Sequence, residues 1–288
     1  MTQNNSLQNP DDSSQEKKRY KRVLSIAGSD PSGGAGIQAD IKTISACGCF
    51  ATTAITSIVD ENTLGVTDVH PVPIRFVTGQ IRSVLDDIGT DAIKIGMLHS
   101  AKLVRAVKET LDEYPDITNI VVDPVMVATS GDPLLESDAV ETLKTLLIPR
   151  AAIITPNIPE AEILLGEKIE RNDQLPDAAR KLSECCGRVS VFLKGGHLTD
   201  TDLVDYFYNG TTGQLLSMSS DRIPTKNTHG TGCTLSSALA SFLAKGAPLE
   251  IAALNAKRYI SAAIESGAEY EIGHGNGPVN HFFQWFDK

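Results

Sequence analysis

The sequence is short of positive charge, of long apolar runs and of regularly spaced cysteines, and each shortage excludes a class of protein. With 36 acidic and 26 basic residues, its formal net charge is -10. A broad nucleic-acid-binding face is therefore not expected, because such a face must be basic. No apolar run approaches the length of a membrane span, and the first residues lack the pattern of a secretory signal. We expect a cytoplasmic protein that binds neither nucleic acid nor membranes.

The five cysteines do not form a disulfide framework. An odd number, with one close pair (Cys47 and Cys49) and one adjacent pair (Cys185 and Cys186), is poorly suited to pairing. The close pair also lacks a companion Cys/His pair at zinc-site spacing. We interpret these four as small buried residues of a reduced protein.

The order of apolar and polar segments predicts an α/β fold. Residues 1–20 are polar and should form a disordered tail, and residues 21–288 a single domain. Apolar strands separated by amphipathic helices are typical of a central, mostly parallel sheet with helices on both faces. Strands are expected at 23–28, 52–59, 92–96, 120–123, 153–155 and 189–194, and helices at 36–47, 74–88, from about 100, 231–244 and 249–266.

One segment departs from this alternation. Residues 203–218 alternate around Asn209 and Gly210, which is a strong hairpin signal. We therefore expect a small antiparallel extension on one sheet edge, and a loop at 273–278. In open α/β sheets, ligands bind beyond the carboxyl ends of the strands. The residues there, most of them polar or glycine, are Ser29, Asp30, Asp60, Glu61, Asn62, Met97, Asp123, Asn157, Glu160, Lys194, Gly195 and Gly196.

The segment 227–234 (NTHGTGCT) predicts an anion hole. It precedes an apolar, Ala-rich helical run, so Gly230 and Gly232 lie where the first helix amides have no internal partner. Glycine lets an oxyanion approach those amides, and the helix dipole favours negative charge. Cys233 would then lie in a positive field that favours a thiolate. The alternative is an ordinary helix start with a buried, inert cysteine.

Three further motifs remain ambiguous when taken alone. The turn 28–36 (GSDPSGGAG) is neither a dinucleotide fingerprint nor a Walker loop, and tight packing explains it as well as an anion does. The segment 155–160 (TPNIPE) places Asn157 and Glu160 on one face of a first helical turn, which favours a capping box over a Mg²⁺ site. Lys194, with two glycines after it, is either a phosphate contact or a solvated side chain.

Together the segments IAGSDPSGGAGIQADIKT, KIGML, TPNIPEAEILLG, LKGGH and KNTHGTGCTLSSALA resemble the hydroxymethylpyrimidine and phosphomethylpyrimidine kinases of thiamine synthesis. These belong to the ribokinase-like superfamily, and the resemblance covers about residues 22–270. It implies one α/β domain, usually a homodimer, with ATP and Mg²⁺. The implied reaction phosphorylates 4-amino-5-hydroxymethyl-2-methylpyrimidine and then its monophosphate.

The resemblance also implies roles for individual residues. The anion hole matches Gly230, Thr231 and Gly232, and Cys233 matches the group that takes the substrate proton. Asn157 and Glu160 match the Mg²⁺ and phosphate motif, acting through water. The ATP side of the cleft matches Asp123, Lys194, Lys226 and Thr228, and the pyrimidine pocket matches Gly28, Asp40, Val59 and Met97.

Glu61 departs from the pattern of the family. The segment IVDENTLGV resembles VAQNTxGV, in which a glutamine reads the aminopyrimidine edge. An ionised glutamate only accepts hydrogen bonds, so the pair needs a proton on Glu61 or on the ring. We expect Asp60 to raise the pKa of Glu61 by like-charge repulsion, and substrate to bind more tightly as pH falls.

Two other functions fit the same motifs. A pyridoxal or pyridoxine kinase would share the anion hole and the cysteine, and a non-catalytic nucleotide- or pyrimidine-binding protein could use the same cleft. The hairpin and residues 126–133 are candidates for a lid over the site.

Overall fold

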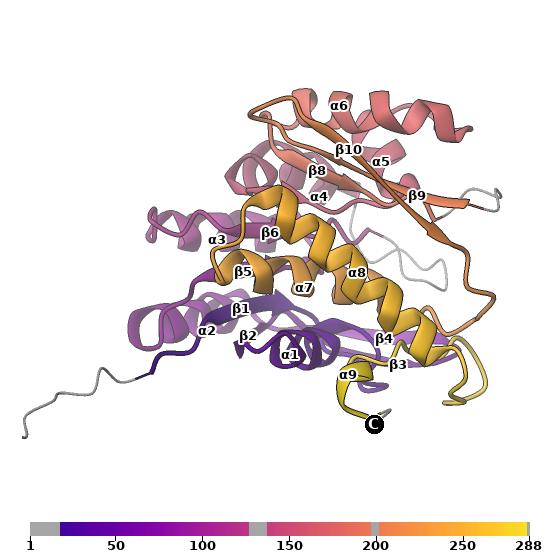
Figure 1. The fold of residues 1–288 in the computed structure, drawn as a ribbon. Coiled ribbons are helices and arrows are strands. Elements are labelled where there is room, and N and C mark those ends of the chain that lie inside the picture. Colours follow the sequence, from indigo (N-terminus) through magenta and orange to yellow (C-terminus); the bar gives the residue numbers. More distant parts are fainter. Residues whose placement is uncertain (1–17, 127–136, 197–201, 287–288) are drawn as a thin grey trace, which may run out of the picture.

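An eight-stranded sheet runs through the centre of the structure (Figure 1). The computed structural model describes residues 18–126, 137–196 and 202–286. Most of the expected tail, nearly all of the candidate lid at 126–133, and His197 of the LKGGH segment lie outside these residues. Among the residues described, none of the helices combines the length and apolarity that a membrane crossing requires.

The predicted sheet, mostly parallel with an antiparallel extension, is confirmed. Its strand order is β10-β9-β8-β7-β6-β5-β1-β2. Strands β1, β2, β5, β6, β7 and β8 are parallel, and β9 and β10 extend one edge antiparallel. The bounds are β1 (Arg22–Ala27), β2 (Phe50–Ile55), β5 (Ala92–Ile95), β6 (Ile120–Val122), β7 (Ile153–Ile154), β8 (Ser190–Leu193), β9 (Asp202–Tyr208) and β10 (Leu215–Asp221).

The expected single strand at 52–59 is wrong, because the chain changes sheet at Thr56. The backbone N–H of Thr56 donates to Ala27 and its hydroxyl to the Met97 carbonyl, 2.9 Å away. Beyond it, β3 (Ser57–Asn62) pairs antiparallel with β4 (Gly65–Pro71) in a separate two-stranded sheet. The Ser29 hydroxyl accepts from Val59 N–H at 3.1 Å and thereby fixes this sheet to the turn after β1.

Helices cover both faces of the large sheet, as predicted (Figure 1). Val23 faces one apolar core, and Leu24, its neighbour, faces the other. The first core packs against α1 (Gly36–Ala46), α7 (Thr231–Ala244) and α8 (Leu249–Gly267). The second packs against α2 (Ile74–Asp87), α3 (Ala101–Asp112), α4 (Ser137–Thr142), α5 (Ile158–Leu165) and α6 (Leu175–Cys185). Shorter turns are η1 (Leu143–Leu147), η2 (Ile148–Arg150), η3 (Asn172–Gln174) and α9 (Phe283–Phe286).

The hairpin turn between β9 and β10 is wider than a two-residue loop. Six residues, 209–214, form the connection. Within it, the Asn209 side chain accepts the N–H groups of Thr211 and Thr212 at 2.9 and 3.0 Å. A Cβ on Gly210 would lie 2.0 Å from the Arg188 carbonyl oxygen. The glycine that signalled a turn is therefore required by its close approach to the turn before β8.

Candidate active site

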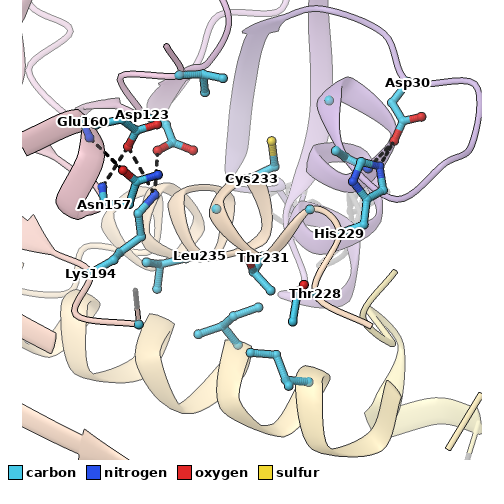
Figure 2. Close-up of a pocket in the computed structure, with 18 of the residues that line it drawn as sticks. Asp30, Asp123, Asn157, Glu160, Lys194, Thr228, His229, Thr231, Cys233 and Leu235 are labelled. Atoms are coloured by element: carbon cyan, nitrogen blue, oxygen red, sulfur yellow. Dashed lines mark hydrogen bonds and ion pairs between the residues drawn. The ribbon is translucent and has the colours of Figure 1, made fainter. Parts of the chain in front are cut away.

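A cleft of about 710 Å³ opens beyond the carboxyl ends of the parallel strands. It is lined by the turn after β1, the β3–β4 sheet, the ends of β5, β6 and β8, the N-terminal turn of α7 and one face of α8. Figure 2 shows Cys233 on the first turn of α7, between a group around Asp123 and Lys194 and a second group formed by Asp30 and His229. The cleft thus lies where ligands bind in open α/β sheets, beyond the carboxyl ends of the strands.

The start of α7 has the geometry of an anion hole. Gly230 is the N-cap residue, in the left-handed conformation with φ of 77°. A Cβ there would lie 1.7 Å from the Gly34 carbonyl oxygen, so only glycine fits. The amides of Gly232 and Cys233 have no hydrogen-bond partner among the described residues, and both residues line the cleft. Two free donors at a helix N-terminus bind an anionic oxygen.

The environment of Cys233 contradicts the expected thiolate. Burial raises the pKa of its thiol to about 11, although Lys94 and the Gly36 amide act in the opposite direction. The helix start therefore does not outweigh desolvation, and at neutral pH the sulfur carries its proton. The side chain is still partly exposed, as a group that meets a substrate must be.

Two ion pairs lie near Cys233, one fully buried and one partly exposed. The ammonium of Lys94 is 2.8 Å from both carboxylate oxygens of Asp40. The ammonium of Lys194 is 3.3 Å from Asp123 Oδ1. Consecutive serines of α7 reach the two carboxylates, with Ser237 Oγ 2.7 Å from Asp40 and Ser236 Oγ 3.3 Å from Asp123.

Asn157 and Glu160 form the capping box that their spacing favours. The Asn157 side chain accepts the Glu160 N–H and the Glu160 carboxylate accepts the Asn157 N–H, each at 2.8 Å. Both residues also line the cleft, and Lys194 Nζ lies 3.9 Å from the Glu160 carboxylate. Burial raises the pKa of Glu160 to about 7, with a further increase from Asp123. A bound cation would relieve this cost of burying negative charge.

At the other end of the cleft, Asp30, His229 and Glu61 form a charged cluster. His229 Nε2 lies 2.8 Å from Asp30 and 3.9 Å from Glu61. The pKa of Glu61 is raised, first by burial and then by Asp30. The direction predicted for Glu61 is thus confirmed, but the predicted cause is wrong. Asp60, on an irregular stretch of β3, is exposed and is not among the causes.

The other expected site residues divide into two sets. Asp40 is fully buried behind the cleft wall, where it contacts Lys94 rather than the open space. Lys226 is exposed and lies outside the lining, and Gly195 packs against the Val204 carbonyl oxygen. The residues that do line the cleft as expected are Gly28, Val59, Met97, Thr228 and Thr231.

Sequence reasoning missed part of the lining. Lys94 was detectable as a charged residue within a buried apolar strand, a position that lysine almost never occupies unpaired. The contribution of α8 was not detectable, because its cleft residues have the spacing of an ordinary core face. These are Lys257, Ile260, Ser261 and Ile264.

Known proteins are similar to this sequence along most of its length. A sequence model of the family described as phosphomethylpyrimidine kinase matches residues 30–280. The hydroxymethylpyrimidine/phosphomethylpyrimidine kinase of Escherichia coli is 45% identical over 270 residues, covering 92% of this chain and 100% of that protein. The thiamine biosynthesis bifunctional protein ThiED of Geobacter sulfurreducens is 47% identical over 90% of this chain, which spans about half (52%) of that protein.

Solved structures share the fold. The pyridoxal kinase of Bacillus subtilis, solved as an ADP complex, has 35% sequence identity and a TM-score of 0.84, covering 93% of this chain and 100% of that one. The phosphomethylpyrimidine kinase of Clostridium difficile has 40% identity and a TM-score of 0.74, covering 85% and 99%. The ribokinase-like architecture expected from the sequence is therefore confirmed.

Proposed function

Because the chain belongs to the phosphomethylpyrimidine kinase family, we propose that it phosphorylates 4-amino-5-hydroxymethyl-2-methylpyrimidine and then its monophosphate. The chain is a phosphotransferase, and ATP is its phosphoryl donor. One observation supports this function most strongly. The free amides of Gly232 and Cys233 lie in the same cleft as Lys194 and the partly exposed thiol of Cys233.

The residues of the cleft suggest how the transfer proceeds. The amides of Gly232 and Cys233 bind the transferring phosphoryl group, whose charge grows on its outer oxygens. Lys194, held by Asp123, neutralises the phosphates of ATP. The thiolate of Cys233 accepts the proton of the substrate hydroxymethyl group as its oxygen bonds to phosphorus. The thiol must first lose its own proton, so the charged groups around Cys233 determine how readily the thiolate forms.

Asn157 and Glu160 fit a hydrated Mg²⁺ ion. Carboxylate and amide oxygens are the donors that Mg²⁺ prefers, and this ion keeps much of its hydration shell. Both side chains already accept helix amides, so contact through water fits them better than direct ligation. When bound, Mg²⁺ would neutralise phosphate charge. Glu160→Gln should raise the Mg²⁺ concentration needed for half-maximal ATP binding, and an unchanged requirement would exclude this role.

We propose that Glu61 recognises the pyrimidine edge. It lines the cleft on β3, opposite Asp30 and His229, and its raised pKa brings protonation nearer to neutral pH. A protonated glutamate both donates and accepts, as a glutamine does. The proposed substrate carries an amino group next to a ring nitrogen, which requires that combination.

A pyridoxal kinase is the second candidate, since structures of that activity share the fold and about a third of the sequence. The test is an ATP-dependent assay with each substrate, following the pyrimidine mono- and diphosphate separately. We expect a higher kcat/KM for the pyrimidine and formation of both products. A preference for pyridoxal would overturn the proposal, and loss of only the diphosphate would restrict it to the first transfer.

We also propose the homodimer that is usual for this family. The described part of the β3–β4 sheet has no further strand on either edge, and Ile58 on β3 and Leu64 in its turn are 49% and 70% exposed. Unpaired edges with exposed apolar side chains favour association. Light scattering should give a dimeric mass for the wild type and a lower mass for Ile58→Glu. A monomeric wild type would exclude this surface.

A further inference from the structure

Lys94 is a buried cation in the middle of the sheet. It lies in β5 between Ile93 and Ile95, and all three side chains are 0% exposed. A buried ion pair rarely stabilises a protein more than apolar side chains of similar volume would. Stability alone therefore does not account for a lysine in this strand.

Asp40 fixes the ammonium of Lys94 firmly. Its carboxylate takes two N–H groups of the lysine at 2.8 Å, and the hydroxyls of Ser25 and Ser237 at 2.5 and 2.7 Å. A Cβ on Gly96 would lie 2.9 Å from Lys94 Nζ, so glycine leaves room for the ammonium. An ammonium has three donors, and among the described residues the only hydrogen bonds recorded for it go to the Asp40 carboxylate. Lys94 lines the cleft, whereas Asp40 does not.

Helices α1 and α7, which carry Asp40 and Ser237, also hold Cys233, one helical turn before these residues. The Gly36 amide donates to the sulfur of Cys233, and Asp40 lies four residues further along α1. Ser237 likewise lies four residues after Cys233 on α7. The charged groups that act on Cys233 are Lys94 from β5, Lys194 after β8, Asp40 from α1 and Asp123 after β6.

We propose that Lys94 is a positioning residue: its ammonium, oriented by Asp40, stabilises the thiolate of Cys233 and so prepares it to accept the substrate proton. This step rests on the proposed kinase function. In it, the O–H bond of the substrate breaks and its proton bonds to sulfur. The oxygen electron pair forms the new bond to the γ-phosphorus of ATP, and the bond from that phosphorus to the bridging oxygen breaks, which releases ADP.

The charges near Cys233 show why one cation matters. With the thiol protonated, two ammonium groups balance two carboxylates, and the thiolate adds one uncompensated negative charge. Among the groups that lower the thiol pKa of Cys233, the ammonium of Lys94 has the largest effect. Burial lowers the pKa of Lys94, but the negative groups around it, Asp40 foremost, together raise it, so the lysine stays charged throughout the useful pH range.

The test measures the thiol directly. In Lys94→Met with Asp40→Asn, both charges disappear while the serines keep a partner at position 40. Iodoacetamide alkylation of each cysteine is followed by peptide mass spectrometry between pH 7 and 11. Because the ammonium lowers the thiol pKa by more than the carboxylate raises it, alkylation of Cys233 at pH 9 should slow about tenfold in this double variant, as expected when the thiol pKa, the midpoint of alkylation against pH, rises by about one unit. Cys185, which is exposed and distant in sequence, serves as the internal reference.

A second variant tests in which direction the thiol pKa of Cys233 changes. Asp40→Asn alone removes a negative charge and leaves the ammonium, so the midpoint of Cys233 should fall. Ser237→Ala disturbs the same packing without changing charge, and should leave the midpoint in place even if it lowers the melting temperature. Alkylation of Cys233 that is no slower in the double variant than in Asp40→Asn alone would overturn the role of Lys94. Because alkylation requires no substrate, this outcome is independent of whether the pyrimidine is phosphorylated.

The kinetic consequence is a split between turnover and ATP binding. In the double variant kcat should fall about tenfold at pH 8 and recover as the pH is raised, while KM for ATP stays constant. A purely structural role would lower kcat equally at every pH. That result, together with unmoved alkylation, would assign Lys94 to the core alone.

Discussion

The carboxylate of Asp30 lies 2.8 Å from Nε2 of His229, although 199 residues separate the two in sequence. The backbone N–H groups of Gly34 and Ala35 donate to the same carboxylate oxygen, at 3.1 and 2.6 Å. The contact joins the turn after β1 to the residue that precedes the N-cap of α7. It therefore couples the wall that carries Glu61 to the anion hole.

Glu61→Gln tests how the pyrimidine is read. Substrate should bind wild-type protein more tightly as pH falls, by about tenfold per pH unit above the raised pKa of Glu61, because the protonated acid is the form that binds. The glutamine variant should bind with little pH dependence. Calorimetric titration between pH 5.5 and 8.5 measures both. A wild-type affinity that does not vary with pH would contradict this role, and a pH effect that persists in the variant would assign it to His229 instead.

Cys233→Ala tests the proton acceptor. We expect kcat to fall at least about a hundredfold, since a positioned base contributes that much or more, while the Kd for ATP stays constant. Steady-state kinetics and nucleotide titration separate the two effects. Cys185→Ala is the control for loss of a thiol. Near-normal turnover in the Cys233 variant would remove this residue from the mechanism.

The raised pKa of Cys233 predicts a basic pH–rate profile. Because the pKa is about 11, the thiolate fraction increases about tenfold for each pH unit between 7 and 10. If proton transfer limits the rate, kcat should rise in parallel. The profile is measured over that range with saturating substrates. A plateau beginning at neutral pH would contradict a rate limited by proton transfer to a thiolate with this pKa.

Gly230→Ala should destabilise the fold as well as the site. It combines a left-handed backbone with a Cβ placed 1.7 Å from the Gly34 carbonyl oxygen. We expect a loss of about 3 kcal/mol or more in the free energy of unfolding. Gly246→Ala has the same left-handed backbone but open space around it, so about 1 kcal/mol is expected there. Urea unfolding compares the two, and equal losses would show that the close approach is unimportant.

Lys194 and Lys226 should differ although both were expected to contact ATP. Lys194 lines the cleft and is held by Asp123, whereas Lys226 is exposed and lies outside the lining. Lys194→Met should raise KM for ATP about tenfold, as expected when a charged contact worth about 1.4 kcal/mol is lost. Lys226→Met should change it less than about threefold. An equal effect would mean that Lys226 reaches the nucleotide.

The sequence predicts the layered fold because each buried strand is an apolar run that ends in a turn residue. It fails at 52–59, where the pattern continues unbroken. The change of sheet at Thr56 depends on hydrogen bonds to Ala27 and Met97, which come from distant parts of the chain. No local pattern records such contacts.

The candidate site was likewise predictable only in part from the sequence. Asp123, Asn157 and Glu160 were predictable from their places after strands, because topology alone brings those ends together. The pKa of Cys233 was not predictable, since it depends on how deeply packing buries the first turn of α7. The pairing of Lys94 with Asp40 also depends on packing, between a strand and a helix 54 residues apart.

The small β3–β4 sheet shares no ladder hydrogen bonds with the large sheet in the described structure. It is fixed by contacts at Ser29 and at Thr63, whose carbonyl accepts the Asn276 N–H at 2.8 Å. Glu61 belongs to this sheet, whereas the phosphoryl-transfer groups lie on the first turn of α7 and after β8 of the large sheet. Under the proposed function, the residue that reads the pyrimidine edge therefore lies apart from the transfer groups, while Gly28 and Met97 complete the pocket from the segments after β1 and β5. Replacement of residues 57–71 could retarget the enzyme while its transfer machinery stays unaltered.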